Sequence, residues 1–318
     1  MKLSRKQWLN LLSYLATAIL LTVTLYCFVG KEQLELLRRM SWSDVALAML
    51  LSLSAYAGNG WELYRLRGKF GFSMEKKDIL LLPLGMNLWG MLLPFQGAMA
   101  YLTVFLKRKY NVKVSVSCSI SLFLYLITIF LSGVAGCVLT LTGNIGSFWF
   151  NAASVLFLSS PVVAWVICRL GDHVPTPRNR ILAAGWEFLR RTLSGIALLL
   201  GDWRLSLSLV GIYLLRLGSM ILFYFWIAHS LGYQETGFLP LLLLNLWNML
   251  SLLIKFTPNN LGISQLVSGI LFSLIALPAE TGVMISLVAT LIFSLVALTL
   301  GTVANFYAIA TFPSPNHH

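Results

Sequence analysis

No Asp, Glu, Lys, Arg or His occurs between Val114 and Cys168. Because a helix needs about 20 apolar residues to cross a bilayer, this stretch is long enough for two membrane-crossing helices. The chain of 318 residues is 58% hydrophobic and only 11% charged, whereas soluble domains carry about 25% charged residues. These features argue against a soluble globular protein. They predict an all-α polytopic membrane protein with a single membrane domain over 1–318.

Hydrophobic runs predict about six full transmembrane helices. We expect them at 9–29, 45–63, 114–142, 148–168, 205–229 and 282–310. The first is predicted to be an uncleaved helix, because its apolar core is longer than that of a signal peptide. Ser41 and Asp44 have the spacing of a capping box and should start the second helix.

Two further apolar segments, 79–106 and 238–277, share the motif NLWxML and are each interrupted by a proline. The first breaks into arms too short to cross a hydrocarbon core of roughly 30 Å, so it should return to the side it enters. The second is either a similar re-entrant hairpin or two short spans. The residues predicted to shape these hairpins are Asn87, Pro94, Gly97, Asn245, Pro258 and Gly262.

The chain carries 23 Lys and Arg against 11 Asp and Glu. The basic residues lie in short loops between apolar segments, so the positive-inside rule and anionic lipid headgroups explain them better than nucleic acid does. The rule is best satisfied when both termini are cytoplasmic and both hairpins return. The segments 45–142 and 205–310 then have opposite orientations, which predicts an inverted-topology repeat.

Arg216 is the most informative single residue, because it lies about 13 residues, or roughly 19 Å, from Trp203 and from His229. A charge at the centre of a span suggests function, and a guanidinium can hold phosphate with two parallel hydrogen bonds. The alternative is a buried pair with Glu62, although Glu62 is expected to form a surface pair with Arg65. The predicted headgroup-binding residues are Arg216, Lys255, Gln96, Asn259, Asn260 and Gln265.

An interfacial amphipathic helix is predicted at 178–199. Leu182, Trp186 and Leu189 share one helical face, and Arg190 and Arg191 lie on the opposite face. The surrounding loop, 169–204, is a candidate docking site for a cytoplasmic enzyme. The four Cys and four His have no metal-ligand or CxxC spacing, so we predict no metal and no cofactor.

Three stretches carry a resemblance to a known family: LLPLGMNLWGMLLPFQGAMAYLTVFLKRKYNV, SVSCSISLFLYLITIF and KFTPNNLGISQLVSGILFSLIAL. Together they resemble the lysylphosphatidylglycerol synthase transmembrane-region family of flippase-like proteins, without the soluble aminoacyl-transferase domain. The resemblance implies a lipid-handling protein of the bacterial inner membrane. Ala98 and Gln265 stand where the family tends to have Glu. An anionic or neutral lipid headgroup is therefore expected in place of a lysyl-lipid.

These patterns lead to three functional hypotheses. The first is a flippase or transporter of a phosphate-bearing lipid. The second is a non-transporting scaffold that docks a lipid-modifying or glycan-assembly enzyme through 169–204. The third is a membrane-embedded transferase, whose only candidate metal ligands would be Asp172, Asp202, Glu75 and Asp78.

Overall fold

The computed structural model describes residues 40–93, 96–142, 148–171, 179–251, 257 and 260–312, together with 19, 22, 23, 26 and 35. These residues form helices and short connections, and no strand occurs among them. The predicted span 9–29 lies almost wholly outside them. Three described helices are long and apolar enough to cross a membrane, so the chain is a helical membrane protein.

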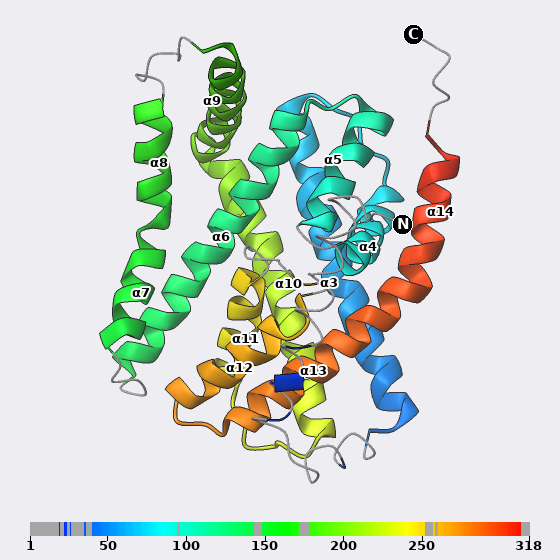
Figure 1. The fold of residues 1–318 in the computed structure, drawn as a ribbon, viewed down its shortest axis with the longest axis vertical. Helices are drawn as coiled ribbons and strands as arrows, with labels where there is room; N and C mark the ends of the chain where they lie inside the picture. The colour runs from blue at the N-terminus through cyan, green and yellow to red at the C-terminus, as the bar shows by residue number, and fades with distance from the viewer. Residues whose placement is uncertain are drawn as a thin grey trace, which may run out of the picture.

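The three long helices are α6, α10 and the continuous run that ends the described chain (Figure 1). α6 covers Val114–Leu141 and α10 covers Trp203–Ser230. The third begins as α13 (Ala279–Val296), passes through the π-helical turn η4 (Ala297–Gly301) and ends as α14 (Thr302–Ala310). The three corresponding sequence predictions are confirmed as helices of spanning length.

The predicted span 148–168 is not one straight helix. α7 (Phe148–Leu158) and α8 (Ser160–Gly171) are bent by 52° relative to each other. Pro161 is the physical reason, because its ring collides with the carbonyl four residues earlier and it has no N–H to donate. If this bent pair crosses as a single span, the described residues contain four candidate spans.

α3 (Trp42–Phe70) covers the predicted span 45–63 and extends it in both directions, but it is not among the three described helices that are apolar enough to cross a membrane. Its predicted capping box is confirmed: the Asp44 N–H donates to Ser41 Oγ at 3.2 Å, and the Ser41 N–H donates to Asp44 Oδ2 at 2.9 Å. The helix ends at Gly71, whose φ of 69° lies in the left-handed region that glycine adopts without strain.

Glycines let α3 approach two other helices closely. A Cβ on Gly60 would lie 1.6 Å from the carbonyl oxygen of Ile79 in α4. A Cβ on Gly58 would lie 2.9 Å from the Cβ of Arg216 in α10. Small residues at such contacts are typical of helix packing in membranes, where close backbone approach drives association. The sequence AGNG therefore brings α4 and α10 onto α3 near Arg216.

α4 (Asp78–Leu92) and α5 (Gly97–Tyr110) fold back on each other and form the first hairpin (Figure 1). At its closed end, a Cβ on Gly97 would lie 2.3 Å from the carbonyl oxygen of Trp89. Only a glycine allows the first turn of α5 to pack this closely on α4.

The open end of the first hairpin is closed by a buried ion pair. Lys109 donates to the two carboxylate oxygens of Asp78 at 2.8 and 3.0 Å, and the Tyr110 hydroxyl also donates to this carboxylate. The start of α4 and the end of α5 therefore meet. This is the return that the charge distribution predicts for segment 79–106.

α11 (Phe238–Ser251) and α12 (Ile263–Leu274) form the second hairpin. Ser268 Oγ of α12 donates to Asn248 Oδ1 of α11 at 3.2 Å. With 14 and 12 residues, neither helix reaches across a core of roughly 30 Å at 1.5 Å per residue. Figure 1 places the first hairpin where α3 ends and α6 begins, and the second at the opposite end, where α10 ends and α13 begins.

α9 (Arg180–Leu200) occupies the predicted stretch 178–199. Its second half packs on α6, where Ser119 Oγ donates to the Thr192 carbonyl at 2.9 Å. In its first half, Leu182 and Leu189 are 61% and 43% exposed. The apolar face of this half is therefore not covered by the described residues, which is the surface that an interfacial helix needs. Its position in a membrane stays a prediction.

Candidate functional site

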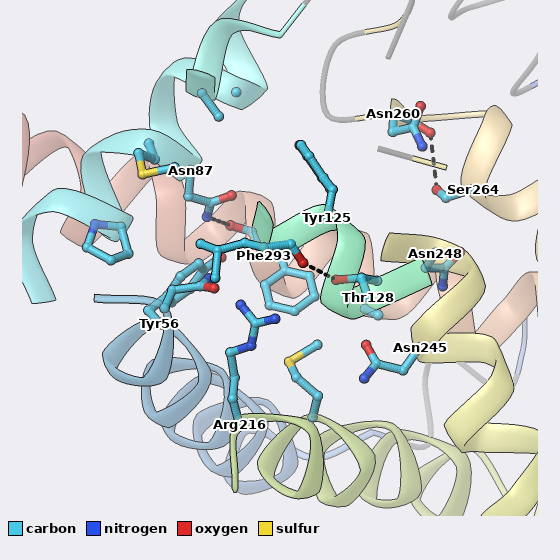
Figure 2. A pocket seen from close by; sticks show the side chains of 18 of the residues that line it. Tyr56, Asn87, Tyr125, Thr128, Arg216, Asn245, Asn248, Asn260, Ser264 and Phe293 are labelled. Carbon is cyan, nitrogen blue, oxygen red and sulfur yellow. Dashed lines mark hydrogen bonds between the residues drawn. The ribbon is translucent and has the colours of Figure 1, made fainter. Parts of the chain in front are cut away.

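A cavity of about 310 Å³ lies between the two hairpins, and residues of α3, α6, α10 and α13 also line it (Figure 2). Arg216 is the only charged residue among the described residues that line it. Apolar side chains such as Met220 and Phe293 cover part of the wall. The polar lining residues are Tyr56, Asn59, Asn87, Ser121, Tyr125, Thr128, Arg216, Tyr224, Asn245, Asn248, Asn260, Ser264, Ser286 and Thr290.

Arg216 lies in the middle of α10, and its side chain is only 8% exposed. The aliphatic part of the side chain passes Gly58 of α3, where a larger residue would collide with it. The guanidinium carbon lies 4.3 Å from the centre of the Tyr213 ring. Figure 2 shows the guanidinium extending from α10 into the cavity. The predicted central cation is therefore held inside the protein.

The expected surface pair between Glu62 and Arg65 is wrong. The Glu62 side chain is fully buried, and its Oε2 lies 3.5 Å from Arg216 Nη1. Arg65 instead donates to Ser208 Oγ at 3.3 Å. Position 62 follows Gly58 by four residues, so it lies on the face of α3 that packs against α10. The alternative, a buried pair of Glu62 with Arg216, is what the structure contains.

This ion pair leaves the guanidinium with capacity for another partner. A separation of 3.5 Å is at the outer limit of a hydrogen bond, and a guanidinium has five N–H donors. A buried pair with poor geometry recovers little of the cost of removing two charges from water. An anionic oxygen in the cavity could therefore bind Arg216 in addition to Glu62.

The two copies of NLWxML have different environments. In the first, Asn87 Nδ2 donates to the Phe293 carbonyl at 3.0 Å, and Trp89 Nε1 donates to Asn305 Oδ1 at 2.9 Å. These bonds attach the first hairpin to α13 and α14. In the second, the Asn245 side chain is buried, and neither its Nδ2 nor its Oδ1 has a partner among the described residues.

Asn245 is therefore a stronger ligand candidate than the sequence indicated. The repeated motif predicts a structural role in the hairpins for both asparagines, and the bonds of Asn87 fit such a role. A buried polar group without a partner costs about 1–3 kcal/mol, so its retention needs an explanation. Figure 2 shows the Asn245 amide pointing from α11 into the cavity that also receives Arg216.

The structure places Gln265 in the contact between α12 and α13. It is fully buried and is not among the residues that line the cavity. Its Oε1 accepts the Gly262 N–H at 2.7 Å, and its Nε2 donates to Thr290 Oγ1 at 3.1 Å. Gly262 precedes α12 with a φ of 83°. These bonds hold the first turn of α12 against α13.

The other predicted site residues are divided between the cavity and its surroundings. Asn260 lines the cavity, and its carbonyl accepts from Ser264 Oγ at 3.1 Å. Gln96 precedes α5 with a φ of 67° and is not among the lining residues. The remaining predictions fall on residues that the structure does not describe, and they stay predictions: Pro94, Lys255, Pro258 and Asn259.

Sequence reasoning missed several lining residues, including Asn59, Tyr125 and Ser286. A single polar residue in an apolar helix is common, so none of them alone indicates a binding site. Two patterns in the sequence could have identified further lining residues. Asn248 occupies the variable position of the second NLWxML motif, and Ser286 and Thr290 are four residues apart, which puts them on one face of α13.

Three of the four acidic residues considered as metal ligands, Glu75, Asp78 and Asp202, contact lysines instead. Lys69 donates to Asp202 at 2.8 Å and, with a backbone N–H of α10, holds the pKa of this carboxyl below its usual range. Asp78 accepts from Lys109, and Asp172 lies outside the described residues. In the part of the chain that the structure describes, no group of three or more His, Cys, Asp or Glu could hold a metal ion.

Comparison of the chain with protein-family models, with curated proteins and with solved structures finds no match. The resemblance to the lysylphosphatidylglycerol synthase transmembrane region therefore stays an expectation from the sequence. The function is inferred from the cavity, from Arg216 as the one charge among its described lining residues, and from Asn245, which has no side-chain partner in the described part of the chain.

Proposed function

We propose that this chain is a lipid flippase or transporter that moves a phosphate-bearing lipid between the leaflets of the bacterial inner membrane. The observation that carries the proposal is the position of Arg216, a buried cation in a cavity lined by both hairpins. Arginine binds phosphate through two parallel hydrogen bonds, which suits it to a headgroup site. The cavity would hold the headgroup while the lipid tails stay in the bilayer.

In this proposal the chain has six full spans, cytoplasmic termini and an inverted repeat of 45–142 with 205–310. The arrangement in Figure 1 supports it, because the two hairpins lie at opposite ends of the molecule. Inverted repeats of this kind bring broken helices together around a central substrate site. Rocking one repeat against the other would then open the cavity to each leaflet in turn.

A transbilayer assay tests this function. The purified chain is reconstituted in liposomes with fluorescent phosphatidylglycerol, and dithionite reports how much of the inner-leaflet probe reaches the outside. We expect Arg216→Gln to slow movement by about 10- to 100-fold, because it removes a charge-assisted bond to phosphate. Arg65→Gln is the matched control, since Arg65 lies on α3 outside the lining residues. Equal rates for wild type and a folded Arg216→Gln protein would contradict the proposal.

A scaffold remains the second candidate, because α9 presents exposed Leu182 and Leu189 on one side and exposed Arg191 on the other. A scaffold that docks an enzyme through 169–204 should lose function when Arg190 and Arg191 are replaced by Glu. It should keep function in Arg216→Gln. Complementation of a strain that lacks the chain distinguishes the two candidates. A transporter should lose function in Arg216→Gln and keep it when Arg190 and Arg191 are replaced by Glu.

A further inference from the structure

The chemistry of the cavity wall narrows the class of headgroup that it can bind. Arg216 is the only charged side chain among the described lining residues, and no carboxylate occurs among them. Glu62 lies beside Arg216 but does not line the cavity. The remaining polar groups are amides and hydroxyls. A wall of this kind is complementary to one negative charge next to uncharged hydrogen-bonding groups.

Two buried lining residues have polar atoms that lack partners among the described residues. They are the amide nitrogen and oxygen of Asn245 and the hydroxyl of Ser286. The amide of Asn245 needs both an acceptor and a donor to be satisfied. A hydroxyl group supplies both, whereas an ammonium supplies only donors and a quaternary ammonium supplies neither. The unpartnered atoms therefore favour an occupant that carries hydroxyl groups.

We propose that the occupant is a phosphodiester whose second substituent is an uncharged, hydroxyl-bearing group such as glycerol or a sugar alcohol. Arg216 binds the phosphate, and Asn245 and Ser286 bind the hydroxyl groups. This inference rests on the proposed lipid transport and names the headgroup class for that site. Glu62 pairs with Arg216 from behind the wall, and no carboxylate among the described lining residues could pair with an amine headgroup.

The volume of the cavity agrees with a phosphodiester headgroup as its occupant. Small-molecule sites have volumes of about 300–1,000 Å³, and the cavity of about 310 Å³ lies at the lower end of that range. It has room for a headgroup and not for two acyl chains as well. The tyrosines of the wall, Tyr56, Tyr125 and Tyr224, could attract a choline group through their rings. A choline lipid nevertheless has no hydrogen-bond donor and would leave Asn245 Oδ1 without a partner, so it is the decisive competitor.

Short-chain lipids with identical tails test the proposal on the full purified chain. Dihexanoyl phosphatidylglycerol, phosphatidylethanolamine and phosphatidylcholine are titrated by calorimetry in an amine-oxide detergent, which has no hydroxyl groups. We expect the glycerol lipid to bind about 10-fold more tightly than the other two, which corresponds to one or two additional hydrogen bonds. Arg216→Gln should weaken all three lipids by about 10- to 100-fold.

Two variants of Asn245 keep the proposal testable even if one of them folds poorly. Asn245→Leu should remove most of the preference for the glycerol headgroup. Asn245→Asp should shift the preference towards the ethanolamine lipid, because it places a carboxylate in the cavity. Asn151→Leu is the control, since Asn151 bonds to Thr140 and does not line the cavity. It should keep the wild-type order of affinities.

The possible failures are distinguishable. If the ethanolamine or choline lipid binds wild type as tightly as the glycerol lipid and Arg216→Gln still weakens binding, the headgroup class is wrong and lipid transport stands. If no lipid binds, or if Arg216→Gln changes nothing, the proposed function fails as well. If glycerophosphoglycerol, which has no tails, binds as tightly as the lipid, the headgroup chemistry is supported and a soluble phosphodiester replaces the lipid as occupant.

Discussion

Two Lys–Asp pairs have the same 2.8 Å separation between Nζ and Oδ2 but very different burial. Lys109 and Asp78 close the open end of hairpin α4–α5, with side chains 6% and 2% exposed. Lys69 and Asp202 join the end of α3 to the start of α10, and each side chain is 31% exposed. Replacing either lysine by methionine keeps much of its apolar stem and removes its charge.

The two replacements should differ greatly in their effect on stability. At 2.8 Å and an effective dielectric constant of about 20, two unit charges attract by roughly 6 kcal/mol, and the loss of hydration offsets most of this. Lys109→Met removes the attraction but leaves the Asp78 carboxylate buried, so the free energy of unfolding should fall by about 3–5 kcal/mol. Lys69→Met leaves Asp202 in contact with water, so its effect should lie within experimental error.

Unfolding of the purified chain by SDS titration in mixed micelles, followed by circular dichroism, measures both changes. The double replacement Asp78→Leu with Lys109→Leu should recover much of the loss, because no unpaired charge is then buried. Equal losses for Lys69→Met and Lys109→Met would refute the reasoning, since burial would then have no effect. A double variant as unstable as Lys109→Met would also refute it.

The same titration tests four further predictions. Gly60→Ala places a methyl group 1.6 Å from a backbone carbonyl oxygen of α4 and should cost about 3 kcal/mol or more, whereas Gly68→Ala, with no atom within 4 Å, should stabilise by up to about 1 kcal/mol. Gln265→Leu should cost about 1–3 kcal/mol by removing the cap bond from the Gly262 N–H and the bond to Thr290 of α13. Gln265→Glu should become more stable as the pH falls, because only a protonated carboxyl can replace the amide donor. The pKa of Asp202 is lowered, first by Lys69. Its contribution to stability is therefore present above its unfolded pKa of about 3.9 and is lost as the pH falls through the folded value. Asp202→Asn should then lose less stability in acid than the wild type.

Much of the helical organisation could be predicted from local sequence. Long apolar stretches identified α6, α10 and the α13–α14 run, because insertion in lipid depends on the apolarity of each segment. Short arms and basic flanks predicted that segment 79–106 returns, and the contact of Lys109 with Asp78 closes it as expected. The bend between α7 and α8 was not predicted, because the hydrophobicity of segment 148–168 does not show the effect of Pro161 on its direction.

The candidate site could be predicted only in part. Arg216 was recognised because a charge in the middle of an apolar helix is costly wherever that helix packs. The partner of Glu62 was predicted wrongly, because three-residue spacing suggested Arg65 while packing turned Glu62 towards α10. Asn245 was assigned a structural role, because its motif is the same as that of Asn87 and its missing partners are visible only in three dimensions.

The sequence by itself determined that this is a helical membrane protein, that segments 79–106 and 238–277 are broken, and that Arg216 lies far from either end of its helix. Each of these is a property of a single segment and its apolarity. Only the tertiary structure decided which polar side chains face one another, that Asn87 is bonded while Asn245 has no side-chain partner among the described residues, and that both hairpins meet Arg216 at one cavity. Such contacts depend on the rotation and crossing of helices, which are set by close packing between residues far apart in the chain.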